Sequence, residues 1–441
     1  SVPLKYPGMA PWEIWISESQ ERMTLAVPPE HIAPFMELMQ RREVEATVIG
    51  EFTASGRCVV EYRGNVVMDI GLAFLHDGLP KKHLRTTCTK MVFPEPNVPC
   101  PERLDSTILL MLRRRNLCSK EFISTQYDHT VQAGHVLGPV QGRGRVQGIS
   151  SLTKVVPGSK KAVGLSQGMF PSYSEIDPYR MAGAGIDTAV RGLVALGIPL
   201  DRIAILDNFC WCSSDEPERL GQLKMAARGC YDIATAYGTP FISGKDSMYN
   251  DFSGFDADNN PVKISVPPTL LISSIGVHED VSKAVSMDAK VDGDLVYVIG
   301  ETAEELGGSE YFIHLGSTGN TVPGLDAAAM TGRYRRMTEA IRHELVASAY
   351  PVTRGGLGIA LAMVAIAGRL GMDITIPGGM RPDYYLFSES LGRFVVTISP
   401  DNKRAFERAL GNDARLIGRV RGTSLRITQE TTVLDLPVSE L

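Results

Sequence analysis

The chain has 441 residues, of which 44% are hydrophobic and 22% are charged, and its formal net charge is -5. This profile is typical of a globular protein with about two or three domains, and it gives no reason to expect nucleic acid or a membrane surface as a partner. We expect neither a membrane-spanning segment nor a signal peptide, because no apolar run approaches the ~18 residues that a span requires. The seven cysteines are scattered, which indicates reduced thiols in a cytoplasmic protein.

Residues 12–75 predict a strand, a helix, a second strand and a hairpin, in that order. The apolar run at 22–27 is the first strand, and a helix beginning near Pro29 carries apolar residues three and four positions apart. The second strand covers 44–52, and residues 56–75 form the hairpin.

The end of the chain repeats this pattern. The sequence Ser-Glu-Ser-Gln-Glu-Arg at 17–22 is echoed by Ser-Glu-Ser-Leu-Gly-Arg at 388–393, and each is followed by an apolar strand, an amphipathic helix and another strand. A period this long does not fit a solenoid and indicates a duplicated domain pair. We therefore expect the end of a first copy followed by the whole of a second, and chance similarity between a few elements is the alternative.

This duplication divides the chain into four parts. Residues 1–80 are expected to be the closing portion of the first copy's C-terminal domain, and the polar, proline-rich residues 81–118 are expected to be a linker. Residues 119–282 and 283–441 are then the N-terminal and C-terminal domains of the second copy. Alternating strands and helices predict an α/β (α+β) fold in both domains.

One stretch of the second copy predicts a ligand-binding edge. The apolar strand 203–206 leads into Asp207, and a helix with Pro217 in its first turn ends at Gly238, which fits a C-cap. A short strand then leads into Ser-Gly-Lys-Asp-Ser at 243–247. The two polar loops would leave two strands at the same end of one sheet, where ligands of α/β proteins usually bind.

The second of these loops has the chemistry of a phosphate or substrate site. Gly244 lets the backbone approach an anion closely, and Lys245 supplies a point charge. Asp246 offers the hard oxygen ligands that Mg²⁺ prefers. The spacing excludes a Walker A loop, and an ordinary strand-to-loop turn is the alternative interpretation.

A glycine-rich run at 138–148 allows two further interpretations. Its backbone N–H groups could form a nest for an anion, although such runs are more often mobile loops. His129, shortly before it, is a candidate acid or base, but a lone histidine is more often structural.

Five motifs together resemble the synthetase part of the phosphoribosylformylglycinamidine synthase family, an ATP-dependent enzyme family of purine biosynthesis. They lie at 8–23, 206–211, 242–247, 306–311 and 387–390. The resemblance covers nearly the whole chain. The family consists of two tandem copies of a fold shared with aminoimidazole ribonucleotide synthetase, in agreement with the internal repeat.

The resemblance implies a reaction. ATP would activate the formyl-amide oxygen of formylglycinamide ribonucleotide as an iminophosphate, and ammonia from a glutaminase domain or subunit would displace phosphate to give the amidine. Such phosphoryl transfer depends chiefly on positioning and charge neutralisation.

The resemblance also implies roles for individual residues. The resemblance implies that the substrate is contacted by Glu18, Ser19, Gln20 and Ser247. It implies that ATP is contacted by Asp207, Gly244 and Lys245. Many relatives have a Mg²⁺-binding Asn in place of Lys245; because an ammonium group cannot ligate a metal, Asp246 is the remaining metal candidate.

Three departures from the family pattern limit this expectation. The family's catalytic His and main nucleotide loop lie in the first part of copy one, so we expect no catalytic residue in this chain and a missing first-repeat half as its partner. The Asp of a Ser-Asp-Ala-Ala stretch is absent at 148–151, and both carboxylates of a His-Asp-x-Ser-Asp-Gly-Gly run are absent at 350–356. Copy two is therefore expected to be a poor Mg-nucleotide site.

The leading hypothesis is an incomplete ATP-dependent carbon–nitrogen ligase that supplies part of a composite active site. The alternative is a non-catalytic structural or regulatory half of the same complex that binds a nucleotide. A relative acting in hydrogenase maturation or selenophosphate synthesis is disfavoured by the Ser-Glu-Ser-Gln and Leu-Asp-Asn-Phe motifs.

Overall fold

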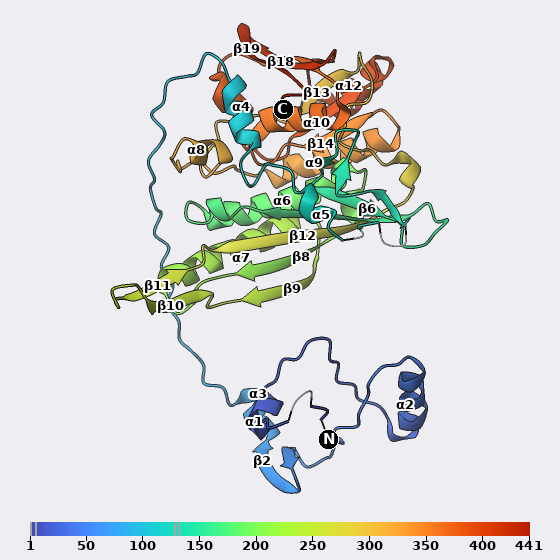
Figure 1. Cartoon of the computed structure of the whole chain (residues 1–441), viewed down its shortest axis with the longest axis vertical. Coiled ribbons are helices and arrows are strands. Elements are labelled where there is room, and N and C mark those ends of the chain that lie inside the picture. Colours follow the sequence, from blue (N-terminus) through green and yellow to red (C-terminus); the bar gives the residue numbers. More distant parts are fainter. Residues whose placement is uncertain (1, 5–6, 128, 131–132) are drawn as a thin grey trace. The chain divides into compact units, whose positions relative to one another are not determined.

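The computed structural model describes residues 2–4, 7–127, 129–130 and 133–441, and the chain separates into two compact units (Figure 1). Unit 1 comprises residues 1–83 and unit 2 comprises residues 84–441. No helix among the described residues is long and apolar enough to cross a bilayer.

Unit 2 contains two large sheets. The six-stranded sheet has the order β3 (His135–Leu137), β6 (Ser150–Thr153), β7 (Ala162–Met169), β12 (Thr269–His278), β8 (Ile203–Cys210), β9 (Phe241–Ser247). Neighbouring strands in it are antiparallel except for β8 and β9, which are parallel. Helix α6 (Pro178–Ala195) packs on this sheet, and α7 (Pro217–Tyr237) packs against α6.

The seven-stranded sheet has the order β14 (Ser348–Pro351), β16 (Phe394–Ile398), β13 (Leu295–Ile299), β17 (Ala414–Val420), β15 (Met372–Thr375), β18 (Ser424–Gln429), β19 (Thr431–Pro437). Its helices are α8 (Glu310–His314), α9 (Ala327–Arg342), α10 (Gly356–Gly368), α11 (Pro382–Phe387) and α12 (Lys403–Leu410). Two small hairpins, β4 (Val140–Gln141) with β5 (Val146–Gln147) and β10 (Asp251–Phe255) with β11 (Pro261–Ser265), complete the strands of unit 2 that the structure describes. The predicted layered α/β fold is confirmed.

Two cores hold these layers together. Strand β13 is buried on both faces, so its side chains alternate between the cores: Tyr297 belongs to the core shared with α6 and α9, whereas Val296 belongs to the core under α10 and α4 (Asp105–Leu112). Helices α6 and α9 lie between the two sheets (Figure 1). This arrangement makes the two predicted domains of copy two a single packed body.

The predicted linker is bound along unit 2 rather than free. In residues 84–104, called the strap below, the Thr87 N–H donates to the Pro217 carbonyl at 3.0 Å, and the Thr89 hydroxyl donates to Glu218 at 2.6 Å. Further along, Phe93 exchanges main-chain hydrogen bonds of 2.8 and 2.9 Å with the side chain of Asn320. The strap then leads to α4, and α5 (Glu121–Ser124) follows.

Unit 1 is small and open. Its elements are α1 (Pro11–Trp15), a 3-10 helix (Pro29–His31), α2 (Ile32–Arg41), β1 (Arg57–Tyr62), β2 (Asn65–Gly71) and α3 (Leu72–Asp77). The predicted helix and hairpin are confirmed, and β1 pairs with β2 in an antiparallel register. No described residue of unit 1 is fully buried.

The two strands predicted at 22–27 and 44–52 are wrong, because neither segment forms a strand. Their counterparts in unit 2 are β16 and β17, which pair with β13, β14 and β15. The described part of unit 1 contains only the strands β1 and β2, so it offers these segments no partner. The hairpin forms because its two strands pair their main-chain N–H and carbonyl groups with each other.

Candidate functional site

The parallel pair β8–β9 brings together the polar residues predicted at the sheet edge. Asp207 lies opposite Gly244, and Ser247 lies at the end of β9. The prediction of loops at 207 and 243–247 is wrong in one respect, because both segments continue their strands and hydrogen-bond to each other. Lys245 and Asp246 are exposed on β9, so their side chains are accessible to a ligand.

Asp207 and Gly244 are in close contact, so a larger residue at 244 would displace the Asp207 side chain. A Cβ atom added to Gly244 would overlap the carboxylate of Asp207. Burial raises the pKa of Asp207, as does the nearby charge of Asp246, while a hydrogen bond from the Lys245 main chain acts in the opposite direction. Two carboxylates that repel each other in this way favour the approach of a cation.

The carboxylates near Gly244 are candidate ligands for Mg²⁺. Asp207 and Asp246 supply hard carboxylate oxygens, which fit the cation. Among the described residues, however, no group of three or more His, Cys, Asp or Glu side chains is placed to hold a metal ion. Magnesium commonly completes its shell with water and substrate phosphates and is then held by only one or two protein carboxylates.

Ser247 is held in place by Asn250, a residue that sequence reasoning missed. The Asn250 side-chain amide donates to the Ser247 hydroxyl at 3.0 Å and to its carbonyl at 2.7 Å. The same amide reaches the carbonyl of Trp211 at 3.2 Å, and Trp211 is fully buried. A polar residue in a short connection gives no signal of this role in the sequence.

Three of the residues expected to contact the substrate, those of the motif at 8–23, lie in unit 1. Glu18, Ser19 and Gln20 are all exposed. The loop that bears them is closed by Arg22, which donates to the carbonyl of Ser17 at 2.6 Å and to that of Ser19 at 3.3 Å. Arg22 was also missed as a functional residue, although it stands in the repeated motif.

The corresponding glutamate of unit 2 is buried and fully engaged. Glu389 accepts hydrogen bonds from the Gly355 N–H at 2.7 Å, the Glu310 N–H at 3.0 Å and the hydroxyl of Tyr173. Burial raises its pKa, and these hydrogen bonds act in the opposite direction. Glu389 therefore has a structural role in unit 2.

A second carboxylate nearby is neutralised by arginines. Glu310 lies 2.6 Å from Arg114 and 3.2 Å from Arg354, and it accepts from Asn116 at 2.6 Å. Burial acts to raise the pKa of Glu310, but the hydrogen bonds of Arg114 and Asn116 and the charge of Arg354 outweigh it and lower the pKa. Arg354 stands in the motif that has lost both carboxylates, so this motif presents an arginine paired with Glu310 and offers no free carboxylate to a Mg-nucleotide.

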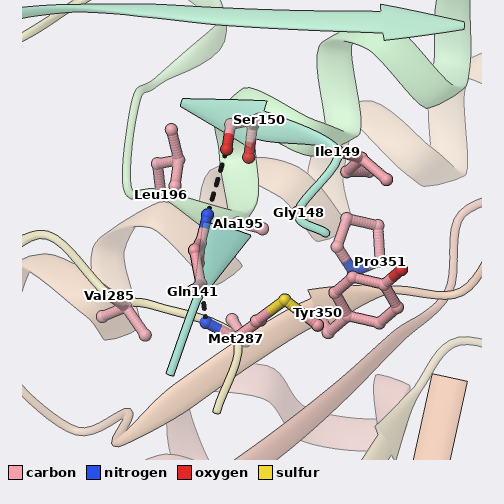
Figure 2. Close-up of a pocket in the computed structure, with 11 residues that line it drawn as sticks. Gln141, Gly148, Ile149, Ser150, Ala195, Leu196, Val285, Met287, Tyr350 and Pro351 are labelled. Carbon is pink, nitrogen blue, oxygen red and sulfur yellow. Dashed lines mark hydrogen bonds between the residues drawn. The ribbon is translucent and has the colours of Figure 1, made fainter. Parts of the chain in front are cut away.

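The two altered motifs of copy two meet at a very small cavity (Figure 2). Gly148 and Ser150 from one motif and Tyr350 from the other line it. The side chain of Gln141 crosses it, donating to the Ser150 carbonyl at 3.0 Å and accepting from the Met287 N–H at 3.2 Å. Its volume of about 10 Å³ holds roughly one water molecule and no nucleotide.

The glycine-rich run fits neither an anion nest nor a mobile loop. It forms the β4–β5 hairpin, and the Gly144 N–H donates to the Ala367 carbonyl at 2.9 Å, at the end of α10. A Cβ at Gly144 would overlap the Ile366 carbonyl, so glycine serves close packing here.

Comparison with known proteins identifies relatives. The family described as "AIR synthase related protein, C-terminal domain" matches residues 1–63 and 291–428, which contain the two copies of the repeated motif. The phosphoribosylformylglycinamidine synthase subunit PurL of Methanocaldococcus jannaschii is 33% identical over 455 residues, and that of Thermococcus gammatolerans is 32% identical over 449 residues. Each match covers 100% of this chain and 59% of the relative, so the chain spans about three-fifths of the length of these relatives.

Solved structures show the same fold. T. maritima PurL complexed with FGAR has a TM-score of 0.54 at 18% identity, and the match covers 68% of this chain and 48% of that one. T. maritima PurL complexed with ATP has a TM-score of 0.52 at 16% identity and covers 76% of this chain and 54% of that one.

Proposed function

We propose that the chain, which is similar to PurL over its whole length and matches the AIR synthase related family model in two segments, forms part of a phosphoribosylformylglycinamidine synthase. The reaction is the ATP-dependent conversion of formylglycinamide ribonucleotide and ammonia to the amidine, a carbon–nitrogen ligation in cytoplasmic purine biosynthesis. The observation that carries the proposal is the β8–β9 pair, where Asp207 and Gly244 are in contact beside the exposed Lys245 and Asp246.

We assign ATP binding to Asp207, Gly244 and Lys245. Gly244 leaves room for the Asp207 carboxylate beside the strand, and the exposed ammonium group of Lys245 is assigned to offset the phosphate charge during phosphoryl transfer. Mg²⁺ when bound would neutralise phosphate charge, and Asp246 is the residue assigned to hold it. The side chains of this chain orient the bound ATP and neutralise phosphate charge, and none of them is assigned as a nucleophile or a base.

We assign substrate binding to Glu18, Ser19, Gln20 and Ser247. The exposure of the first three supports a binding role, since the corresponding glutamate of unit 2 is buried and engaged by protein donors. Asn250 supports Ser247 by fixing its hydroxyl. An amide substrate with a ribose offers the N–H and O–H donors that a glutamate accepts.

The proposed partners follow from the same homology. A solved assembly of T. maritima bears the name PurLQS, and the proposed source of ammonia is a glutaminase subunit or domain. The second proposed partner is the part that corresponds to the remaining two-fifths of PurL, in the same or another polypeptide, which would complete the active site.

The test measures ATP-dependent amidine formation from formylglycinamide ribonucleotide and ammonium. The chain is assayed alone and after co-expression with the part of M. jannaschii PurL that it does not match, with complete M. jannaschii PurL as the positive control. We expect turnover only in the combination, and loss of that turnover in Lys245→Ala but not in Lys224→Ala, an exposed lysine of α7.

Two results would contradict this proposal. Turnover by the chain alone would show that it needs no completing partner, and an inactive combination beside an active control would remove the synthase assignment. Tight binding of ADP and Mg²⁺ to the chain alone that persists unchanged in Lys245→Ala, in a calorimetric titration, would lie outside the assigned ATP site and would favour the alternative of a structural nucleotide-binding half. The pairing of Glu310 with Arg114 and Arg354 argues against that alternative.

A further inference from the structure

Arg22 closes the loop that carries the proposed substrate residues of unit 1. Its Nη2 donates to the Ser17 carbonyl at 2.6 Å and its Nε to the Ser19 carbonyl at 3.3 Å, while the two serine hydroxyls lie 3.2 Å apart. We call Ser17, Ser19 and Arg22 the first clasp. A guanidinium group has the planar fork needed to hold two carbonyls at once.

The same contacts occur in unit 2. Nη2 of Arg393 donates to the Ser388 carbonyl at 2.6 Å and Nε to the Ser390 carbonyl at 2.8 Å, and the two serine hydroxyls lie 3.1 Å apart. We call Ser388, Ser390 and Arg393 the second clasp. In both loops, therefore, the arginine Nη2 donates to the carbonyl of the first serine and Nε donates to the carbonyl of the second.

The backbone of the two loops also agrees. Glu21 has a φ of 60°, and the residue at the corresponding place in unit 2, Gly392, has a φ of 71°. This left-handed conformation costs a glutamate energy that glycine avoids. Unit 1 nevertheless adopts it, which indicates that the turn is required to bring the arginine under its two carbonyls.

The surroundings of the two clasps differ. The second is buried, and its Ser388 hydroxyl donates to the Ala303 carbonyl at 2.6 Å while Arg393 also donates to Thr302 at 2.8 Å. The first clasp keeps its contacts although Ser19 and Arg22 are exposed. The arginine–carbonyl contacts are therefore a local property of the Ser-x-Ser-x-x-Arg sequence and need no surrounding core.

We infer that Arg22 is a positioning residue for substrate recognition. By fixing the carbonyls of Ser17 and Ser19, it holds the loop in one conformation. The side chains of Glu18, Ser19 and Gln20 are then already positioned when the substrate binds. Arg22 acts through these residues and needs no contact with the substrate. This inference rests on the proposed function, because the substrate role of residues 18–20 is part of it.

The first test is steady-state kinetics in the reconstituted synthase, comparing Arg22→Ala, Arg22→Lys and Arg42→Ala. Arg42 is an exposed arginine at the end of α2 and serves as the control. We expect Arg22→Ala to raise KM for formylglycinamide ribonucleotide roughly tenfold, the effect of losing about one charged hydrogen-bond pair. KM for ATP should stay unchanged, because the residues assigned to ATP are in unit 2.

Partial recovery by Arg22→Lys supports the inference, since lysine restores the charge and one donor but not the fork. A wild-type KM for the ribonucleotide in Arg22→Ala overturns it, and so does an equal rise in both KM values, which indicates a general structural defect. The control Arg42→Ala is expected to match the wild type.

A second measurement separates this inference from the proposed function. If the wild-type combination has no activity, the proposed function fails, and hydrogen exchange of the chain alone then decides the inference. Arg22→Ala should speed exchange of the amides within 17–22, whereas Arg42→Ala should not. Equal exchange in Arg22→Ala and wild type would mean that the arginine does not order the loop, and the inference is then wrong.

Discussion

Asp187 and Arg191 lie one helical turn apart on α6 and form an ion pair, 2.9 Å long, whose side chains are both fully buried. Arg191 also donates to the main-chain carbonyls of Val352 and Arg393, and Asp187 accepts from the hydroxyl of Tyr237 at 2.9 Å. The pair therefore links α6, which covers the six-stranded sheet, to the residues that directly follow β14 and directly precede β16 in the seven-stranded sheet.

Removing one partner of this pair should destabilise unit 2 strongly. Arg191→Met leaves Asp187 as an uncompensated buried charge, so we expect a loss of about 3–5 kcal/mol in the free energy of unfolding, measured by urea denaturation. The matched control is Arg228→Met, which breaks a pair of the same spacing and 2.9 Å length with Asp232 on α7, where the arginine is exposed. This control should lose much less, because exposed ion pairs contribute little to stability, and equal losses would contradict the assignment.

The stability contributed by Glu310 should depend on pH. Its pKa is lowered in the folded protein, because the hydrogen bonds of Arg114 and Asn116 and the charge of Arg354 outweigh burial. Such a group stabilises fully above its unfolded pKa, about 4.3 for glutamate, and loses this contribution as the pH falls through the folded pKa. The unfolding free-energy difference between wild type and Glu310→Gln should thus be largest above about pH 5 and shrink on acidification.

The measurement for Glu310 is denaturant unfolding at a series of pH values from neutral to acid. Glu304→Gln, at an exposed glutamate in the preceding segment, is the control and should show a small difference that changes little. A difference for Glu310→Gln that stays constant on acidification would contradict the lowered pKa.

The strap should be released by one added methyl group on α7. A Cβ at Gly221 would overlap the carbonyl of Thr87, so Gly221→Ala should free the strap and speed tryptic cleavage at Arg85 and Lys90. Gly332→Ala on α9 is the matched control, because its Cβ meets only the flexible end of Arg336. Unchanged cleavage in Gly221→Ala would mean that the strap is not held at this point.

Gly244→Ala should damage ATP use without unfolding the protein. The new methyl group would displace the Asp207 carboxylate, so we expect KM for ATP in the reconstituted synthase to rise about tenfold, as expected for a lost charged hydrogen bond. Because β9 is an exposed edge strand, the free energy of unfolding should change by about 1 kcal/mol or less. Ser243→Ala, one residue earlier, is the control, and a wild-type KM for ATP in Gly244→Ala would count against the site.

Local signals in the sequence were sufficient for much of unit 2. Helix α7 begins at Pro217 and ends at Tyr237, and its C-cap is Gly238, whose φ of 70° lies in the left-handed region. The parallel pairing of β8 with β9 follows from a strand–helix–strand order. These features depend on neighbouring residues, which is why pattern and capping rules predict them.

The strands expected at 22–27 and 44–52 depend on distant partners, which a local pattern cannot supply. The strap likewise had the composition of a free linker, and only its contacts with Glu218 and Asn320 show that it is bound. In the sequence Arg354 marks only the loss of a carboxylate, whereas in the structure it forms an ion pair with Glu310, 44 residues earlier in the chain. Such long-range pairing of polar groups leaves no periodic trace in a sequence.

Strand β9 is the last strand of its sheet, so one side of its backbone has no strand partner in the part of the chain that the structure describes. An open strand edge is a template on which another molecule can add its own strand and start aggregation. Lys245 and Asp246, both exposed on this edge, oppose such addition through their charge. Replacing them with apolar residues would therefore lower solubility as well as remove ligand contacts, so lost activity in such variants has to be separated from precipitation.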